Sequence, residues 1–136
     1  MVTAVDTSVL LDVLLNDPQH APASIAALRQ GSVQGSLILC EIVLAELAPT
    51  LAPAEMLQFL SDWNLTFVPS SQSSAILAGE MFGTYLLRGG KRSRIVPDFI
   101  VAAHAQTHAQ RLLARDRGYY RDYFKQLQLW DPSRGS

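Results

Sequence analysis

The stretch over residues 2–15 constrains the fold of this chain more than any other. It begins with a short apolar run at 2–5, meets an acid at Asp6, and continues through Thr7 and Ser8 into a second apolar run. This pattern predicts a buried strand and then a mostly buried helix, which Thr7 or Ser8 can cap. Asp6 is therefore expected at the carboxyl end of a strand, where open α/β sheets bind ligands, although it could also be only a helix-capping or turn residue.

The rest of the chain alternates short apolar runs with longer helical patterns. We expect further strands at 36–39, 65–68, 111–114 and 127–130, helices at 22–31, 41–50, 54–63, 73–88 and 99–110, and a short irregular or helical piece at 119–124. Gly31 is expected to end the helix that begins at Pro22. Such alternation favours a parallel sheet that is covered on both faces. The 136 residues, almost half of them hydrophobic, predict one domain over 1–136, an α/β/α fold in three layers with a central parallel sheet.

Cysteine usage and hydropathy bear on location. Cys40 is the only cysteine and lies in an apolar run, so we expect a buried small hydrophobe rather than a catalytic thiol. The lack of an intrachain disulfide favours a cytoplasmic protein. The N-terminus has no signal-peptide pattern, and no apolar run approaches the ~20 residues of a membrane helix.

Charge is distributed unevenly along the chain. Residues 1–87 carry eight acids and one base, a net of −7, whereas residues 88–136 carry ten bases and four acids, a net of +6. A basic part of this kind suggests a polyanionic partner, although small domains can also carry an uneven solvated surface.

Four acids stand out by their context: Asp6, Glu46, Asp98 and Asp116. Asp6 and Asp116 follow predicted strands, and Asp98 opens a predicted helix after Pro97. Glu46 lies in a helix segment without other charges, where a buried carboxylate must be paired or must bind a metal. Each acid also has a structural alternative: Asp98 as a charge at a helix N-terminus, Asp116 as a turn former, and Glu46 as the partner of an arginine.

Convergence of these acids on one rim of the sheet requires a cation. Two unit charges ~4 Å apart repel by about 4 kcal/mol at an effective dielectric constant of 20. Mg²⁺ or Mn²⁺ offsets this repulsion, because both are hard cations that prefer carboxylate and water oxygens. A site of this kind performs metal-assisted phosphodiester hydrolysis, and a basic flank then attracts the polyanion that the acids alone would repel.

Four short motifs resemble those of the PIN-domain ribonucleases. They read VDTS at 5–8, VLAEL at 43–47, PDFIVAAHA at 97–105 and LLARDRGYY at 112–120. The resemblance covers nearly the whole chain. The length and the single-domain layout are similar to those of the VapC-type toxins of bacterial toxin–antitoxin pairs. The resemblance implies a Mg²⁺- or Mn²⁺-dependent endoribonuclease that forms a homodimer and is blocked by a cognate antitoxin protein. The sequence does not name the RNA target, and tRNA or another structured RNA is a candidate substrate.

The resemblance also implies roles for individual residues. It makes Asp6, Glu46, Asp98 and Asp116 the catalytic and metal-binding acids, with Glu80 as an accessory acid. The chain departs from the family pattern at Ala114, where many relatives carry a Ser or Thr two residues before the last acid. No hydroxyl is therefore available there to orient a water or brace a carboxylate. The alternative function is a PIN-like module that binds RNA or a partner without cutting.

Other residues near the predicted rim have simpler interpretations. Arg115 and Arg117 flank Asp116, and a basic loop at 88–94 precedes Asp98, so these cations could hold an RNA backbone. We expect the tyrosines of 119–123 to pack in the core or a dimer rather than to stack on bases. His104 and His108 are expected to be surface or packed side chains, because the zinc-protease motif is absent.

Overall fold

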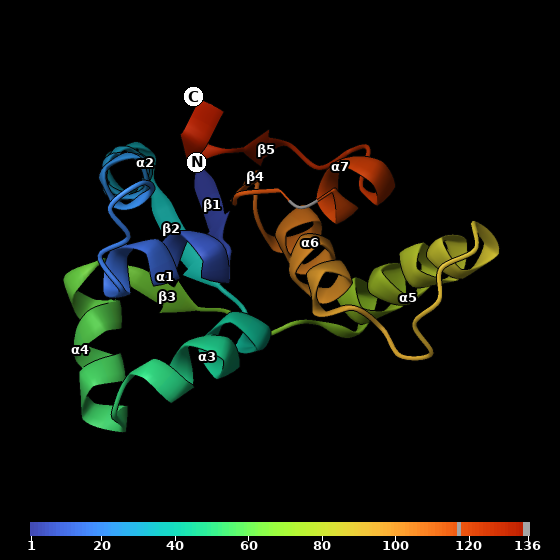
Figure 1. Cartoon of the computed structure of the whole chain (residues 1–136), viewed down its shortest axis with the longest axis horizontal. Helices are drawn as coiled ribbons and strands as arrows, with labels where there is room; N and C mark the ends of the chain where they lie inside the picture. Colours follow the sequence, from blue (N-terminus) through green and yellow to red (C-terminus); the bar gives the residue numbers. More distant parts are fainter. Residues whose placement is uncertain (117, 135–136) are drawn as a thin grey trace.

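Five parallel strands form the sheet at the centre of the molecule (Figure 1): β1 (Val2–Val5), β2 (Ser36–Leu39), β3 (Leu65–Phe67), β4 (Arg111–Leu113) and β5 (Leu129–Trp130). The computed structural model describes residues 1–116 and 118–134. The strand order is β3-β2-β1-β4-β5, and each neighbouring pair is parallel. The predicted parallel sheet is therefore confirmed.

The central strands are apolar on both faces. Ala4 and Val5 of β1, Leu37 and Leu39 of β2, and Leu112 of β4 are each at most 2% exposed. Helices must therefore cover both sides of the sheet, because a strand that is buried on both faces has no solvated side. This requirement explains why these strands read as continuous apolar runs rather than as alternating patterns.

Seven α-helices and two 3₁₀ turns lie around the sheet in the described residues: α1 (Thr7–Leu14), α2 (Ala21–Gln34), α3 (Glu41–Leu47), η1 (Ala48–Thr50), α4 (Pro53–Asp62), α5 (Gln72–Leu87), α6 (Pro97–His108), α7 (Tyr119–Tyr123) and η2 (Pro132–Arg134). α2 contacts β2 and α4 contacts β3, while α6 contacts β1 and β4. Because crossovers between parallel strands are right-handed as a rule, the strand order implies α1 to α4 on one face and α5 to α7 on the other. The predicted three-layer α/β/α architecture is confirmed.

The direction of the chain across the sheet reverses beside β1. The chain first moves outward from β1 through β2 to β3, and then returns to place β4 on the other side of β1. The Asp6 N–H donates to the Leu113 carbonyl at 3.0 Å, so the pairing of β1 with β4 continues to the first residue after β1. Such a reversal is the topological switch point at which open α/β sheets form a ligand crevice.

The predicted end of α2 at Gly31 was wrong, because the helix continues to Gln34. A Cβ on Gly31 would lie 2.9 Å from Leu37 Cδ2 and 3.5 Å from the Trp130 ring, so this glycine lets the helix approach the sheet closely. Gly35 ends the helix instead, and a Cβ there would lie 1.8 Å from the Met1 carbonyl oxygen.

Two further predictions can be compared with the fold. Cys40 is 1% exposed, and burial raises the pKa of its thiol, so it is the buried small hydrophobe that the sequence indicated. None of the helices in 1–116 and 118–134 combines the length and the apolar character that crossing a membrane requires.

His104 is a packed histidine at the junction of α6 and the end of β3. It is 1% exposed, and its Nε2 lies 2.7 Å from the Val68 carbonyl oxygen. Because a carbonyl only accepts hydrogen bonds, this nitrogen carries the proton and donates it. Burial lowers the pKa of His104, since the imidazolium would lose its hydration, although the bond to Val68 opposes that shift.

We expect the free energy of unfolding to decrease as the pH falls below about 6.5, the ordinary pKa of histidine. His104 has a lower pKa in the folded protein, so in this range the unfolded chain binds more protons than the folded one. Urea titrations at neutral and mildly acidic pH measure the effect. His104→Gln, whose amide can still donate to Val68, should reduce the pH dependence. If the variant keeps the wild-type slope, another group is responsible.

Candidate functional site

A cleft of about 390 Å³ lies where β1 and β4 end, at the topological switch point. Its lining contains all four acids that the sequence singled out, namely Asp6, Glu46, Asp98 and Asp116. They come from four separate places: the residue after β1, α3, the first turn of α6, and the loop after β4. The structure thus brings the four acids to one cleft, while their catalytic and metal-binding roles remain predictions.

Asp6 is buried and held in a fixed orientation. It is 8% exposed, and the Tyr120 hydroxyl donates to its Oδ1 at 2.8 Å. The Ser8 hydroxyl and backbone N–H donate to Oδ2 at 2.6 and 3.2 Å. Asp6 itself therefore caps α1, which is one of the two roles the sequence left open for it, whereas Thr7 and Ser8 do not cap the helix. The contact with Tyr120 could not be inferred from the sequence, because no local pattern joins the two residues.

Glu46 is exposed, so the argument from the cost of burying its charge was wrong. α3 buries Val43 and Leu47 on one side and leaves Glu46 among the lining of the cleft. The Thr7 hydroxyl donates to Glu46 Oε1 at 2.6 Å. This bond links α3 to the start of α1 and orients the glutamate without burying it.

Asp98 lies in the first turn of a helix, and Asp116 lies in the loop that precedes one. Asp98 is 6% exposed in the first turn of α6, where a negative charge interacts favourably with the helix dipole. Asp116 is half-buried and accepts hydrogen bonds from the N–H groups of Gly118 at 2.8 Å and Arg121 at 3.2 Å. Its carboxylate therefore satisfies backbone donors at the start of α7.

The chemistry of this donor set suits a hard divalent cation, because carboxylate and hydroxyl oxygens line the cleft. Within residues 1–116 and 118–134, no three carboxylate, imidazole or thiol side chains lie close enough together to hold one ion as they are placed. Asp6, Glu46 and Asp116 accept hydrogen bonds from protein donors instead. Each carboxylate oxygen has two lone pairs, so these bonds leave capacity for a cation.

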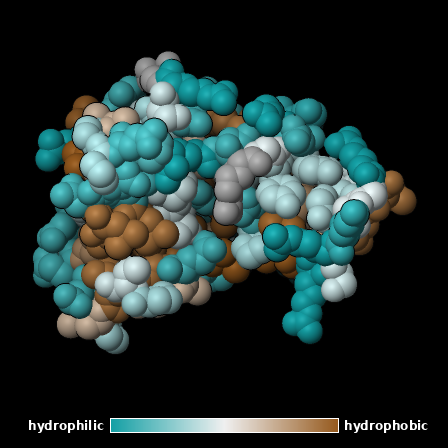
Figure 2. Space-filling model, in the orientation of Figure 1, coloured by the Kyte–Doolittle hydropathy of each residue, from teal (hydrophilic) through white to brown (hydrophobic). Residues whose placement is uncertain are grey.

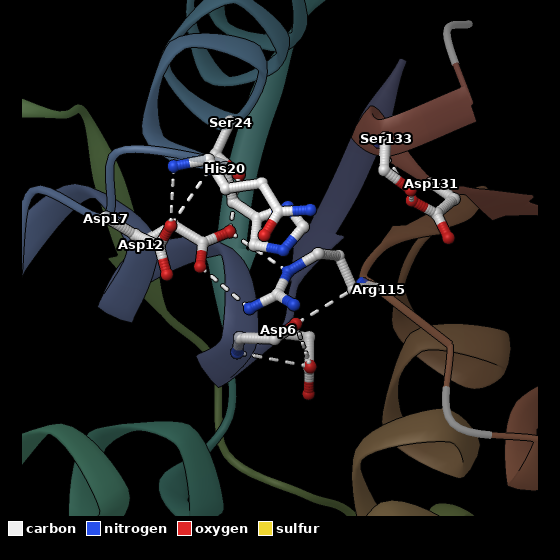
Figure 3. A network of polar contacts seen from close by, with 10 residues as sticks. Asp6, Asp12, Asp17, His20, Ser24, Arg115, Asp131 and Ser133 are labelled. Atoms are coloured by element: carbon white, nitrogen blue, oxygen red, sulfur yellow. Dashed lines mark hydrogen bonds and ion pairs between the residues drawn. The ribbon is translucent and has the colours of Figure 1, made fainter.

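The sequence did not reveal an ion pair beside the cleft between a buried acid and a partly exposed arginine (Figure 3). Arg115 reaches from the end of β4 to Asp12 of α1, with Nη2–Oδ1 at 2.7 Å and Nε–Oδ2 at 3.1 Å. Asp12 is 3% exposed, and the Ser24 hydroxyl also donates to it at 2.8 Å. The Arg115 backbone N–H donates to Ser8 Oγ at 3.2 Å. The Arg115 guanidinium is thus bound to Asp12 while Arg115 also lines the cleft, and its role toward RNA stays a prediction.

The remaining predicted residues lie as follows. Arg117 falls outside the described residues. Glu80 is exposed on α5 and does not line the cleft, so the structure does not bring it to the four acids. Ala114 is fully buried in the core. Tyr119 and Tyr123 pack against the ring of Phe99, which agrees with the predicted packing role of these tyrosines.

The family model of the PIN domain matches residues 3–125. The chain belongs to the PIN-domain family. No curated protein matches it. The predicted resemblance is therefore confirmed at the level of the family.

Solved toxin–antitoxin complexes share the fold. A chain of VapBC2 from Rickettsia felis, bound to a DNA fragment from its promoter, aligns with a TM-score of 0.71 and 18% identity, covering 96% of this chain and 98% of that chain. VapBC-1 from nontypeable Haemophilus influenzae aligns with a TM-score of 0.69 and 17% identity, covering 98% of this chain and 99% of that chain. DNA-bound VapBC from Salmonella typhimurium aligns with a TM-score of 0.67 and 18% identity, covering 97% of this chain and 98% of that chain. Identities this low establish a common fold, the one predicted from the VapC-type resemblance.

Removing the guanidinium from the pair of Asp12 and Arg115 should destabilise this PIN domain. We expect Arg115→Met to lower the free energy of unfolding by about 2 kcal/mol, because Asp12 keeps its charge in a buried place. In the double variant Asp12→Asn/Arg115→Met, part of this loss should be recovered, since no unpaired charge remains. Urea unfolding measures the wild type, the two single variants Asp12→Asn and Arg115→Met, and the double variant.

Arg121→Met is the matched control, because Arg121 pairs with Asp122 at 3.4 Å on the surface. It should change the free energy of unfolding by no more than about 0.5 kcal/mol. A double variant in which the two single effects simply add would contradict a direct energetic coupling between Asp12 and Arg115.

Proposed function

We propose that this PIN-domain protein is a divalent-metal-dependent endoribonuclease, the toxin of a toxin–antitoxin pair that acts in the cytoplasm. The observation that carries the proposal is the cleft at the end of β1 and β4, where carboxylates from four separate elements meet in a chain of the PIN family. Each acid also has a structural role of its own, but those separate roles do not require all four acids to line the same cleft.

The proposed roles follow from the placement of each side chain. Asp6, Glu46, Asp98 and Asp116 hold Mg²⁺ or Mn²⁺ through their carboxylate oxygens. When bound, the cation activates water and offsets the charge that develops on the phosphodiester. Ser8 and Tyr120 orient Asp6, and Thr7 orients Glu46, through the bonds described above. In phosphodiester hydrolysis of RNA, water attacks the phosphorus atom, and the bond from phosphorus to a ribose oxygen breaks.

Substitution of single acids tests this proposal. We expect Asp98→Asn and Asp6→Asn each to lower the cleavage rate of end-labelled total tRNA by roughly 100-fold, because the loss of about 3 kcal/mol of charge stabilisation corresponds to that factor. Chelator should abolish cleavage by the wild-type protein, and Mg²⁺ or Mn²⁺ should restore it. Quantified product bands give the rates.

Asp62→Asn is the control for this experiment, because Asp62 is an exposed acid on α4 that does not line the cleft. It should cleave like the wild type. Full cleavage by both Asp6→Asn and Asp98→Asn would falsify the proposal. No cleavage at all by folded protein free of antitoxin would instead favour the non-cleaving alternative, with Ala114 as the residue to restore to Ser.

An antitoxin partner is part of the proposal, and the solved VapBC complexes that share the fold support it. We assign its binding to an apolar groove of about 560 Å³ between α3, η1 and α4. The groove is lined by Leu44, Ala45, Ala48, Leu51, Pro53, Met56 and Leu57. Figure 2 shows further apolar surface over α1 and α4. The groove adjoins Glu46 in the sequence, so an amphipathic helix bound there would lie beside the cleft.

Leu57→Asp tests this groove. Leu57 is 70% exposed, so the charge should leave the fold intact. We expect the affinity for the protein encoded immediately upstream to fall about 30-fold, or roughly 2 kcal/mol, because the charge is desolvated in the complex. Titration calorimetry measures the affinity. Val33→Asp on α2, 88% exposed and outside the groove, is the control. Equal affinities for both variants would place the antitoxin elsewhere.

The predicted homodimer remains a prediction, and we include it in the proposal. Leu86 and Leu87 at the free end of α5 are 44% and 90% exposed, and Figure 2 shows apolar surface at that end of the molecule. An exposed apolar tip of this kind supports contact with a second copy. Sedimentation equilibrium of the purified chain measures its mass directly, and a monomer would contradict this part of the proposal.

A further inference from the structure

A second cleft of about 370 Å³ adjoins the site on the far side of the loop after β4. Asp116 lines both clefts, so the two adjoin at this residue. The second cleft is also lined by Arg111, Arg121, Gln128, Trp130 and Arg134. We call it the arginine cleft, because its three arginines outnumber its two acids, Asp116 and Asp131.

One of the three arginines is fixed in place. The Arg111 guanidinium lies over the Trp130 ring at 4.1 Å from the ring centroid, and its Nε donates to Thr3 Oγ1 at 2.9 Å. Arg111 therefore forms a rigid, positively charged wall of the cleft. Because the Arg111 guanidinium is already fixed in this position, it can contact an anionic ligand without moving.

The other two arginines are only weakly held. Arg121 is 59% exposed and pairs with its neighbour Asp122 at 3.4 Å. Arg134 is 75% exposed and lies 4.0 Å from Asp131, whose other oxygen accepts two bonds from Ser133 (Figure 3). Surface pairs of this kind contribute about 0–1 kcal/mol. Both guanidinium groups can therefore turn to a phosphate at little cost.

We propose that the arginine cleft binds the backbone of the RNA substrate beside the bond that is cut, with Arg121 and Arg134 as phosphate ligands; this inference rests on the proposed function. The acids of the first cleft repel a polyanion, so a substrate needs cations directly next to them. The guanidinium fork matches phosphate oxygens in a bidentate manner. Asp116 lies between the two clefts, so RNA that leaves the first cleft there enters the second.

The basic loop between α5 and α6 is the competing place for RNA. Lys91, Arg92 and Arg94 are all exposed there, but they line neither cleft. The loop therefore supplies a matched control: Lys91 and Arg92, two exposed cations of the same charge on a different part of the surface.

The test uses binding rather than cleavage. A short fluorescein-labelled oligouridylate is titrated with Asp98→Asn protein, and fluorescence anisotropy gives the affinity over a range of NaCl concentrations. We expect Arg121→Gln/Arg134→Gln to weaken binding about tenfold and to reduce the slope of log K against log[NaCl] by about 1.4, since each phosphate contact on a single strand contributes about 0.7. Arg121→Lys/Arg134→Lys should recover much of the slope, because the charges remain.

Lys91→Gln/Arg92→Gln, made in the same Asp98→Asn protein, should keep the affinity of that protein and its slope of log K against log[NaCl]. An equal loss in this control would overturn the inference, because general surface charge would explain the binding. Unchanged affinity and slope in Arg121→Gln/Arg134→Gln, or no RNA binding by Asp98→Asn protein, would also overturn it. If wild-type protein does not cleave RNA while the arginine dependence of binding is found, the nuclease proposal fails, and only the RNA-binding role of the arginine cleft stands.

Discussion

The parallel pairing of β1 with β4 is the contact on which the candidate site depends. Thr3 pairs with Arg111 and Val5 with Leu113, so the first strand lies beside one that forms near the end of the chain. Side chains alternate between the two faces of a strand, so a slip of one residue would move each of them to the other face. The register is therefore also what sets the placement of Asp6 and Asp116 around the cleft.

The ion pair of Asp12 and Arg115 fixes the loop that follows this pairing. Two apolar side chains of similar volume could stabilise the fold equally well, since burying charges offsets much of their attraction. They could not build the same chain of contacts, in which Ser8 accepts from the Arg115 backbone and donates to Asp6. Together with the Tyr120 hydroxyl, this arrangement braces Asp6 in a chain that has no hydroxyl at Ala114.

What the sequence could predict depended on local patterns. Continuous apolar runs predicted the five strands, because the sheet is covered on both faces, and acids directly after strands indicated a shared rim. The end of α2 could not be predicted, because Gly31 serves contacts with Leu37 and Trp130 that exist only in the folded protein. The exposure of Glu46 depended equally on which side of α3 faces the core.

The uneven charge of the chain acquires a physical meaning only when its two parts interleave. β4 of the basic part lies beside β1 of the acidic part, so cations and acids lie close together at the carboxyl ends of these strands. Screening limits the interactions of exposed charges to about 8 Å at physiological ionic strength. Only cations next to the acidic cleft can therefore offset its repulsion of a phosphate. Position relative to Asp116, rather than the net charge of residues 88–136, decides which arginines can recruit RNA.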